Sequence, residues 1–345
     1  MITDPEYEEI LLSKSVTIAG TTAGPGEKKH GSVRVPGLFA DGQPYEIPFT
    51  VYNGVGDGPH LYIQIAQHPG ETWGLEGVYN VLSTLDPENL NGVVTFSLPN
   101  AVGFRFATYF PPQITHDINR VGKGDPDGSL MERMVDTWWT NFVEGRADYV
   151  IDIHGVPPKT FVYYEDEGVS PGIPSEVAEK SERMALLYSA DFVQKQLEAY
   201  GGGSSFRGAC VDHGIPAIVP EVSPQGASIT ERGLRNIMVD LGMIEGEIVL
   251  PPVQYILNWT SDRKANSVAT NVGGCLIPKV EIGDVVEEGD EVAVIYSPRT
   301  FEVLETLKAH RDGYVSTIRK YPVKSAGERV MSILEILDVV KNNGL

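Results

Sequence analysis

Short apolar runs alternate with helix-like stretches in the middle of the chain. The apolar runs have the length of strands and lie at 61–66, 93–96, 149–153 and 217–219. Apolar positions with helical spacing follow them at 72–85, 129–142, 176–199 and 228–243. Because strands joined through helices usually run parallel, we predict an α/β fold with a mixed, mainly parallel sheet flanked by helices.

Two of the predicted helices begin with a capping box. Ser129 and Ser228 each precede a glutamate by three residues, Glu132 and Glu231. In this pattern the serine hydroxyl accepts a hydrogen bond from the first turn and the glutamate bonds back to the serine. We therefore expect one helix to begin at each serine.

Both ends of the chain read as strands and turns. The first 55 residues contain β-rich segments between glycines and prolines, and no helical pattern resumes after Pro251 and Pro252. The tail repeats itself with an offset of 38 residues, since Val285 and Gly289 recur as Val323 and Gly327. We expect a larger domain at 1–255, with N-terminal strands at 1–55, and a small two-fold β barrel or sandwich at 256–345. The boundary should fall between 250 and 270.

Charge and composition narrow the range of partners. The 345 residues are 41% hydrophobic, enough for a sizeable core, and carry a formal net charge of −20. Such an acidic surface repels phosphate backbones and anionic lipids, so we expect neither nucleic acid nor a membrane as a partner. The two cysteines are too few for a disulfide framework. No apolar run is long enough to span a membrane, and residues 1–6 are acidic, unlike a signal peptide, so we expect a cytoplasmic protein.

Four chemically versatile side chains follow the predicted strands. His68 and Glu71 come after 61–66, His154 after 149–153 and Glu221 after 217–219. In a parallel sheet the carboxyl ends of the strands share one edge, where ligands bind. Two imidazoles and a carboxylate are the ligand set of an open catalytic zinc site, which leaves Glu221 to move protons and Asp152 to orient an imidazole. The alternatives are a solvated turn, a core histidine and a rim charge.

Asn119 and Arg120 form a second candidate group. A guanidinium binds a carboxylate through two hydrogen bonds, and the neighbouring amide adds a further donor. We expect the pair to hold a substrate carboxylate, and a surface turn is the alternative.

These motifs, in this order, resemble the succinylglutamate desuccinylase/aspartoacylase family of zinc carboxypeptidase-like hydrolases. The segments 100–104 and 214–217 also resemble family motifs. The tail, with Gly283-Asp284 and Gly289-Asp290, resembles the family's C-terminal β domain, which is similar to lipoyl and biotinyl carriers. A carrier displays a lysine at a hairpin tip, and 297–303 contains none, so we expect an unmodified lid or wall.

The resemblance implies a site with one Zn²⁺ and three ligands: His68, Glu71 and His154. It further implies that Glu221 is the general base and acid, and that Asn119 and Arg120 hold a substrate carboxylate. Two departures stand out. The family's His-Gly-Asn-Glu is His-Pro-Gly-Glu here, and the place of an arginine that polarises the scissile carbonyl is taken by Tyr109. Tyr109, Arg105 or zinc itself would then stabilise the oxyanion.

The expected function is hydrolysis of the amide bond of a small N-acyl amino acid or related amide that carries a carboxylate. Two alternatives stay open, a zinc carboxypeptidase that trims peptides and an inactive family member used for binding or scaffolding. The acyl group and the amine are not fixed by the sequence. The sequence also leaves open whether the chain forms a homo-oligomer.

Overall fold

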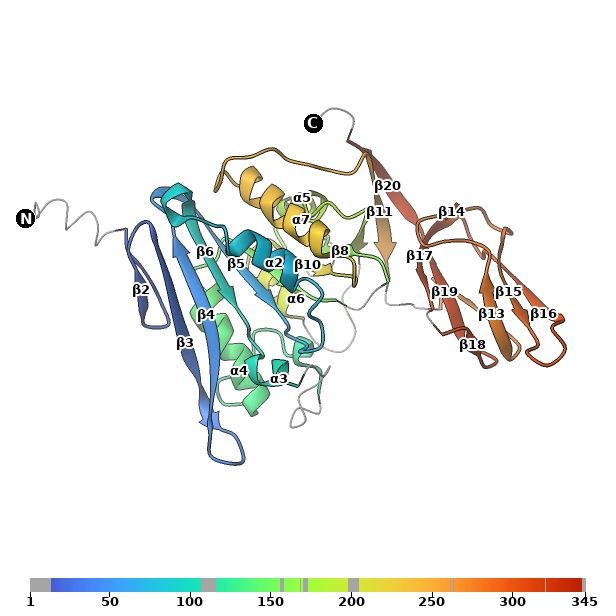
Figure 1. Ribbon diagram of the computed structural model, residues 1–345, viewed down its shortest axis with the longest axis horizontal. Helices are drawn as coiled ribbons and strands as arrows, with labels where there is room; N and C mark the ends of the chain where they lie inside the picture. The colour runs from blue at the N-terminus through green and yellow to red at the C-terminus, as the bar shows by residue number, and fades with distance from the viewer. Residues whose placement is uncertain are drawn as a thin grey trace, which may run out of the picture.

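The computed structural model describes residues 14–106, 116–155, 158–167, 169, 173–197, 205–260, 262, 264–319 and 321–342. One large sheet forms the centre of the larger part of the structure, and a smaller β sandwich lies beside one end of this sheet (Figure 1). Among the described residues, no helix is both long enough and apolar enough to cross a membrane.

The large sheet has ten strands. Their spatial order is β20 (Ile336–Lys341), β11 (Val253–Trp259), β9 (Phe192–Gln196), β8 (Phe161–Glu165), β10 (Ala217–Glu221), β7 (Tyr149–Ile153), β5 (Gly56–Ile65), β6 (Asn91–Ser97), β4 (Pro44–Asn53) and β3 (Glu27–Leu38). The central run β6–β5–β7–β10 is parallel, as is β8–β9–β11, whereas the two edges and the β10–β8 junction are antiparallel. The mixed, mainly parallel sheet is therefore confirmed.

Both faces of the central strands are buried, which explains their unbroken apolar sequences. Tyr62 and Val150 point to one face and Ile63 and Ile151 to the other, because successive strand residues alternate. Six α-helices are described: α2 (Leu75–Leu82), α3 (Ala101–Phe104), α4 (Leu130–Trp138), α5 (Ser175–Leu187), α6 (Phe206–Asp212) and α7 (Ala227–Asp240). The helices α2, α5 and α7 cover the Ile63 face, and α4 and α6 cover the Tyr62 face.

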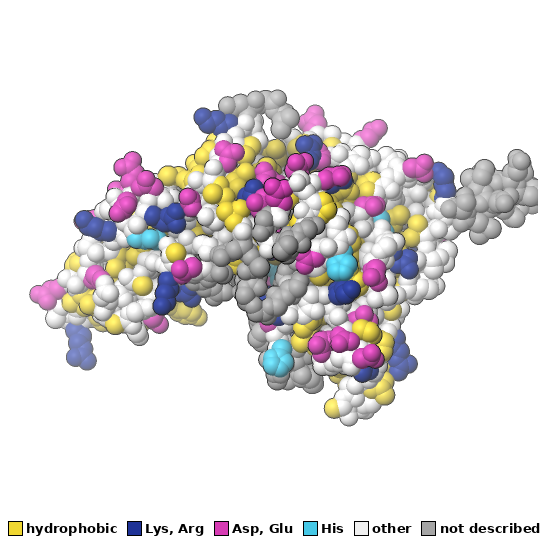
Figure 2. Space-filling view, turned by 180° about the vertical axis from the view of Figure 1, so that it is seen from behind, with side chains coloured by type: hydrophobic (Ala, Val, Ile, Leu, Met, Phe, Trp, Pro, Cys, Tyr) yellow, Lys and Arg dark blue, Asp and Glu magenta, His cyan; other side chains and the backbone are white. Residues whose placement is uncertain are grey.

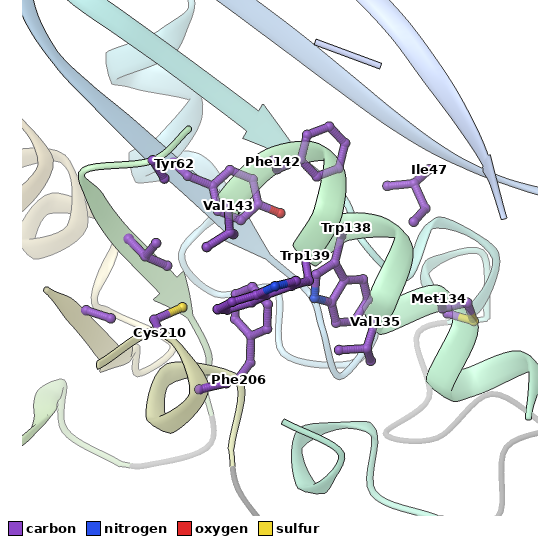
Figure 3. Packing of buried hydrophobic residues seen from close by; sticks show 14 of the residues in the cluster. Ile47, Tyr62, Met134, Val135, Trp138, Trp139, Phe142, Val143, Phe206 and Cys210 are labelled. Carbon is purple, nitrogen blue, oxygen red and sulfur yellow. The ribbon is translucent and has the colours of Figure 1, made fainter. Parts of the chain in front are cut away.

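Aromatic side chains fill the layer between α4, α6 and the sheet. Trp138 and Trp139 both meet the ring of Phe206 edge-on, at centroid distances of 5.7 and 6.1 Å (Figure 3). Phe142 stacks on Tyr62 of β5 at 5.5 Å. These rings fix α6 and the end of α4 against the strands that carry the candidate site.

One capping box is confirmed and the other is wrong. Ser129 and Glu132 exchange the two expected hydrogen bonds at the start of α4. In contrast, α7 begins at Ala227 after an N-cap glycine, Gly226, with no side-chain cap, so Ser228 lies inside the helix. The backbone turn at Gly226 starts the helix two residues too early for the serine to cap it.

The long helix expected at 176–199 is also wrong. The helix α5 ends at Leu187, and Ser189 then takes a left-handed conformation with φ of 67°. Phe192 and Val193 continue as strand β9, where both side chains are buried in the sheet. Burial of these two β-favouring residues outweighs continued helix formation.

The tail forms a sandwich of two four-stranded sheets. One contains β12 (Ser267–Ala269), β19 (Arg329–Leu334), β17 (Gly313–Ile318) and β14 (Val285–Val286). The other contains β16 (Val303–Lys308), β15 (Glu291–Tyr296), β13 (Gly274–Pro278) and β18 (Val323–Lys324). The 38-residue offset relates β14 to β18 and β15 to β19, and each short strand pairs in the opposite sheet, β14 with β17 and β18 with β13. The expected repeat is thus present in the fold.

The sandwich is joined to the large sheet by strands as well as by packing. One residue after β19, the chain enters β20, which pairs with β11. Tyr314 of the sandwich packs against Phe192 and Tyr255 of the large sheet. The division at 255/256 stays a prediction, and it crosses β11. At the other end, β1 (Val16–Ile18) and β2 (Thr21–Ala23) form a separate hairpin.

Candidate metal centre and active site

Three neighbouring parallel strands, β5, β7 and β10, deliver the candidate residues to one edge of the sheet. The chain leaves β5 through Ala66, whose φ of 63° turns the backbone sharply. A tight turn follows, closed by a hydrogen bond from the Glu71 N–H to the His68 carbonyl of 2.9 Å. His154 comes directly after β7, and Glu221 is the last residue of β10.

His68, Glu71 and His154 form one buried group. Their ligand atoms all lie within 4.8 Å of one another. The Nδ1 atoms of the two histidines are 3.2 Å apart, and Glu71 Oε2 lies 3.1 Å from His68 Nδ1 and 2.7 Å from His154 Nδ1. This spacing lets the three atoms share one metal ion.

The far side of each imidazole meets another carboxylate. Nε2 of His68 lies 2.8 Å from Asp117 Oδ1, and Nε2 of His154 lies 3.1 Å from Asp152 Oδ2. Asp152 is itself held by the Gln64 amide, which donates to Oδ1 at 2.8 Å. Each carboxylate favours a proton on Nε2, so the lone pair of Nδ1 faces the centre of the group. Metal-binding histidines are commonly oriented in this way.

Acidic side chains outnumber the imidazoles in this buried region. Burial disfavours a charged His154, yet the carboxylates of Asp152 and Glu71 outweigh burial and hold the pKa of His154 well above its usual value. Burial likewise opposes a charged His68, but hydrogen bonds to Asp117 and Glu71 raise its pKa. The same imidazoles hold the pKa of Glu71 well below its usual range, despite the burial that opposes this shift. Such excess negative charge suits a divalent cation.

Glu221 lies beside this group without belonging to it. Its backbone pairs with His154, because the His154 N–H donates to the Pro220 carbonyl and the Val222 N–H donates to the His154 carbonyl, both at 2.9 Å. Its Oε2 atom is buried and has no hydrogen-bond partner among the described residues. Burial raises the pKa of Glu221 to about 7, with a smaller raising effect from Glu71. A carboxylate of this kind can both take up and release a proton near neutral pH.

A cavity of about 330 Å³ extends from Glu221 toward the sandwich. Asn119 and Arg120 line it, and the expectation that they hold a substrate carboxylate stays a prediction. The Asn119 amide oxygen accepts from the Phe206 N–H at 2.9 Å, so its NH₂ group is what it can offer a ligand. Arg120 is braced by its own chain, through a hydrogen bond to the Asn119 carbonyl and an ion pair with Asp117 at 3.4 Å.

One of the two candidate oxyanion donors, Arg105, is not part of this group. Arg105 is exposed at the C-cap of α3 and is absent from the cavity lining. Tyr109 lies outside the described residues. Their roles stay predictions.

The sequence analysis did not single out two residues of this region, Asp117 and Arg207. Asp117 lies two residues before Asn119, and no sequence pattern links it to His68. Arg207, in α6, lines the cavity and is buried, with hydrogen bonds to Glu165 of 2.9 and 3.2 Å. The signal for Arg207 was its place in an apolar segment, where an arginine needs a carboxylate partner.

Comparison with known proteins identifies the family of the chain. Residues 57–237 match the model of the succinylglutamate desuccinylase/aspartoacylase catalytic domain. The chain belongs to this family. The matched segment contains the metal group, Glu221 and the Asn119–Arg120 pair, so the resemblance found in the sequence is confirmed.

Relatives extend the match beyond the catalytic segment. The chain is 26% identical over 307 residues to the N-alpha-acetyl-L-2,4-diaminobutyric acid deacetylase of Halomonas elongata, covering 85% of this chain and 86% of the relative. Its fold is similar to the ectoine utilization protein EutE (DoeB) from Ruegeria pomeroyi, with a TM-score of 0.73, 20% identity and coverage of 89% and 95%. An aspartoacylase family protein from Mesorhizobium loti also has a TM-score of 0.73, at 22% identity and coverage of 94% and 98%.

Proposed function

We propose that this family member hydrolyses the amide bond of a small N-acyl amino acid with the help of one Zn²⁺. His68, Glu71 and His154 would hold the ion. Zinc–nitrogen bonds of about 2.0–2.1 Å place two tetrahedral nitrogen ligands about 3.3 Å apart. The 3.2 Å between the two Nδ1 atoms fits this requirement, as does the absence of cysteine from the group.

Zinc bound at this group supplies Lewis-acid activation of a water molecule and of a carbonyl oxygen. Glu221 takes the proton that the attacking water loses and returns it to the departing amine. Asp117 and Asp152 keep the two imidazoles in the orientation that the group requires. Asn119 and Arg120 orient the substrate through its carboxylate. Tyr109 or Arg105 is assigned to the developing oxyanion.

The observation that carries the proposal is the state of Glu221. A carboxylate oxygen that is buried without a hydrogen-bond partner costs free energy, unless a ligand or a water uses it. It lies beside three residues able to hold a metal and at the end of a cavity with a carboxylate-binding pair. Together these are the parts of a metal-assisted amide hydrolase.

The experiment is a substrate screen with zinc-loaded protein. N-acetyl-L-2,4-diaminobutyrate, named by the Halomonas relative, is assayed beside N-acetyl-L-aspartate, N-acetyl-L-glutamate, N-succinyl-L-glutamate and blocked dipeptides. Release of a free amine from at least one N-acyl amino acid, abolished by a chelator and restored by zinc, is the expected result. Hydrolysis of blocked dipeptides alone would instead indicate a carboxypeptidase. No hydrolysis of any compound would contradict the proposal.

A further inference from the structure

A row of buried polar side chains crosses the middle of the large sheet. Ser97 of β6 lies opposite Gln64 of β5, and Gln64 lies opposite Asp152 of β7. Residues opposite each other on neighbouring strands point to the same face, and Tyr62, two residues before Gln64, points there too. All four residues are 0% exposed. Polar groups buried in this way cost free energy unless they bond to one another.

Hydrogen bonds join the four side chains into one row that ends at His154. The Tyr62 hydroxyl lies 2.7 Å from Ser97 Oγ and donates to Gln64 Oε1 at 2.9 Å. The Gln64 amide donates to Asp152 Oδ1 at 2.8 Å, and the other oxygen of Asp152 meets His154 Nε2 at 3.1 Å. The row therefore reaches from β6, through β5 and β7, to the candidate metal centre.

The direction of each hydrogen bond in the row is set by its neighbours. An ionised carboxylate only accepts, so Asp152 turns the NH₂ end of the Gln64 amide toward itself and leaves Oε1 facing Tyr62. Tyr62 gives its single proton to Oε1, which leaves the Ser97 hydroxyl as the donor to the Tyr62 oxygen. Burial raises the pKa of Tyr62 well above its usual value, so that proton stays in place. Each of these donors thus points along the row toward Asp152.

Asp152 depends on these donors because it is removed from water. Acidic side chains are spread over the face seen in Figure 2, where water solvates them, whereas Asp152 is buried. A buried carboxylate needs hydrogen bonds that replace the lost solvation. Gln64 supplies one at Oδ1, which leaves Oδ2 for the imidazole of His154. The partner of His68 differs, since Asp117 is partly exposed and bonds within its own loop.

We propose that Gln64, Tyr62 and Ser97 are positioning residues of the metal centre, which act through Asp152 on the imidazole of His154. The Gln64 amide fixes the orientation of the Asp152 carboxylate. The Tyr62 hydroxyl prevents the amide from turning over, and Ser97 holds that hydroxyl in place. The row thereby keeps Nδ1 of His154 directed at the ion. This inference rests on the proposed function, which supplies zinc as the ion.

Two substitutions interrupt the row at different points. Tyr62→Phe removes the hydroxyl and keeps the ring, which stacks on Phe142 at 5.5 Å. The Gln64 amide can then turn over, so we expect zinc affinity to fall by about twofold to tenfold, the contribution of one hydrogen bond. Gln64→Met removes the donor to Asp152 itself and should weaken zinc binding by about 10-fold or more. Chelator competition measures both, and unchanged zinc affinity in Gln64→Met would overturn the proposal.

Tyr52→Phe is the matched control. Tyr52 of β4 is 3% exposed, packs in the core on the other face of the sheet and donates its hydroxyl to the Leu82 carbonyl at 2.7 Å. Both tyrosine variants lose a buried hydrogen bond, so both should lower the free energy of unfolding of the metal-free protein. Only Tyr62→Phe should lower zinc affinity. Equal losses of zinc affinity in the two variants would indicate general destabilisation and contradict the proposal.

A double-mutant cycle tests whether Tyr62 acts through Gln64. In Gln64→Met the acceptor of the Tyr62 hydroxyl is gone, so adding Tyr62→Phe should change zinc affinity no further. Ser97→Ala should likewise weaken zinc binding by itself and have no effect when combined with Tyr62→Phe. If the separate losses of Tyr62→Phe and Gln64→Met instead multiplied, Tyr62 would act on the site independently of the row, and the proposal would be wrong.

A ring proton of His154 separates this inference from the proposed function. If the protein binds zinc and hydrolyses no compound, the hydrolase proposal has failed and the zinc affinities still decide the role of the row. If the protein takes up no zinc, NMR of the metal-free protein decides, through the Nε2–H signal that disappears in His154→Gln. Faster exchange of this proton with water in Gln64→Met and Tyr62→Phe, but not in Tyr52→Phe, supports the row. Unchanged exchange in all three overturns it.

Discussion

Two aspartates face the outer nitrogens of the two imidazoles in the candidate metal centre. Asp117 and Asp152 face the Nε2 atoms of His68 and His154. Replacing either aspartate by asparagine removes the negative charge that favours a proton on Nε2, so the Nδ1 lone pair is no longer fixed toward the ion. We predict that Asp117→Asn and Asp152→Asn each weaken zinc affinity by about 10- to 100-fold.

Competition with a chromophoric chelator measures these affinities. Asp57→Asn serves as the control, because the Asp57 side chain is 96% exposed and remote from the site. Unchanged zinc affinity in both site variants would show that the two carboxylates play no part in metal binding.

Glu221 has a different role, because it faces the metal group without belonging to it. We predict that Glu221→Gln lowers kcat by about 10²- to 10⁴-fold, the usual contribution of a general acid–base, while one equivalent of zinc stays bound. Glu76→Gln, an exposed change in α2, should leave both quantities unaltered. Turnover is followed by amine release and zinc by elemental analysis, and wild-type turnover in Glu221→Gln would refute the assignment.

The pKa of Glu221 gives this role a pH dependence. Burial raises that pKa to about 7, and only the ionised carboxylate can accept a proton. Wild-type activity should therefore fall as the pH drops below neutrality. The residual activity of Glu221→Gln should lack this acid limb, since glutamine does not titrate in that range.

The sequence predicts those residues of the candidate site that follow a strand or end one. His68, Glu71, His154 and Glu221 each come just after or at the end of a strand, and parallel strand ends share an edge. Arg329, which also lines the cavity, has no such local signal, because it belongs to the sandwich, a distant part of the chain. Only the packing of the sandwich against the sheet could reveal it.

At the scale of elements, the apolar pattern predicts the central parallel strands but not their neighbours. The predicted helix at 176–199 includes strand β9, because local apolar spacing does not separate this strand from α5. Strand β8 lies in an aromatic segment, Phe161–Glu165, that pairs antiparallel with β10 and so breaks the expected alternation. The secondary structure of such segments depends on pairing between strands that are distant in sequence. The local spacing of apolar residues carries no information about this pairing.

Ser129 and Ser228, the serines of the two expected capping boxes, allow a test of where α4 and α7 begin. Ser129 caps α4, whereas Ser228 is exposed inside α7 and caps nothing. We predict that Ser129→Ala lowers the free energy of unfolding by about 1 kcal/mol, because a first-turn N–H loses its acceptor. Ser228→Ala should have no cost, since alanine is the better helix former. Urea denaturation measures both, and equal effects would contradict the assignment of the caps.

At the scale of the whole molecule, the sandwich lines the cavity beside the candidate metal centre because it is fixed to the large sheet. Tyr314 is 1% exposed and lies 5.1 Å from the ring of Phe192 and 4.9 Å from that of Tyr255. We predict that Tyr314→Ala lowers the free energy of unfolding by about 3 kcal/mol or more, through lost burial and the cavity left behind.

Tyr321→Ala is the control for this change. Tyr321 also belongs to the sandwich but is 77% exposed, so its loss should alter the free energy of unfolding by less than about 0.5 kcal/mol. Chemical denaturation compares the two variants. Similar small effects would mean that this aromatic contact does not hold the sandwich on the sheet.

Anomalous X-ray diffraction at the zinc absorption edge, from crystals of the zinc-loaded protein, tests the central claim most directly. The account predicts one strong peak, about 2.0–2.1 Å from Nδ1 of both His68 and His154 and in contact with the Glu71 carboxylate. Glu221 should remain outside bonding distance of that peak. Zinc-loaded crystals without a peak between these three residues would contradict the account.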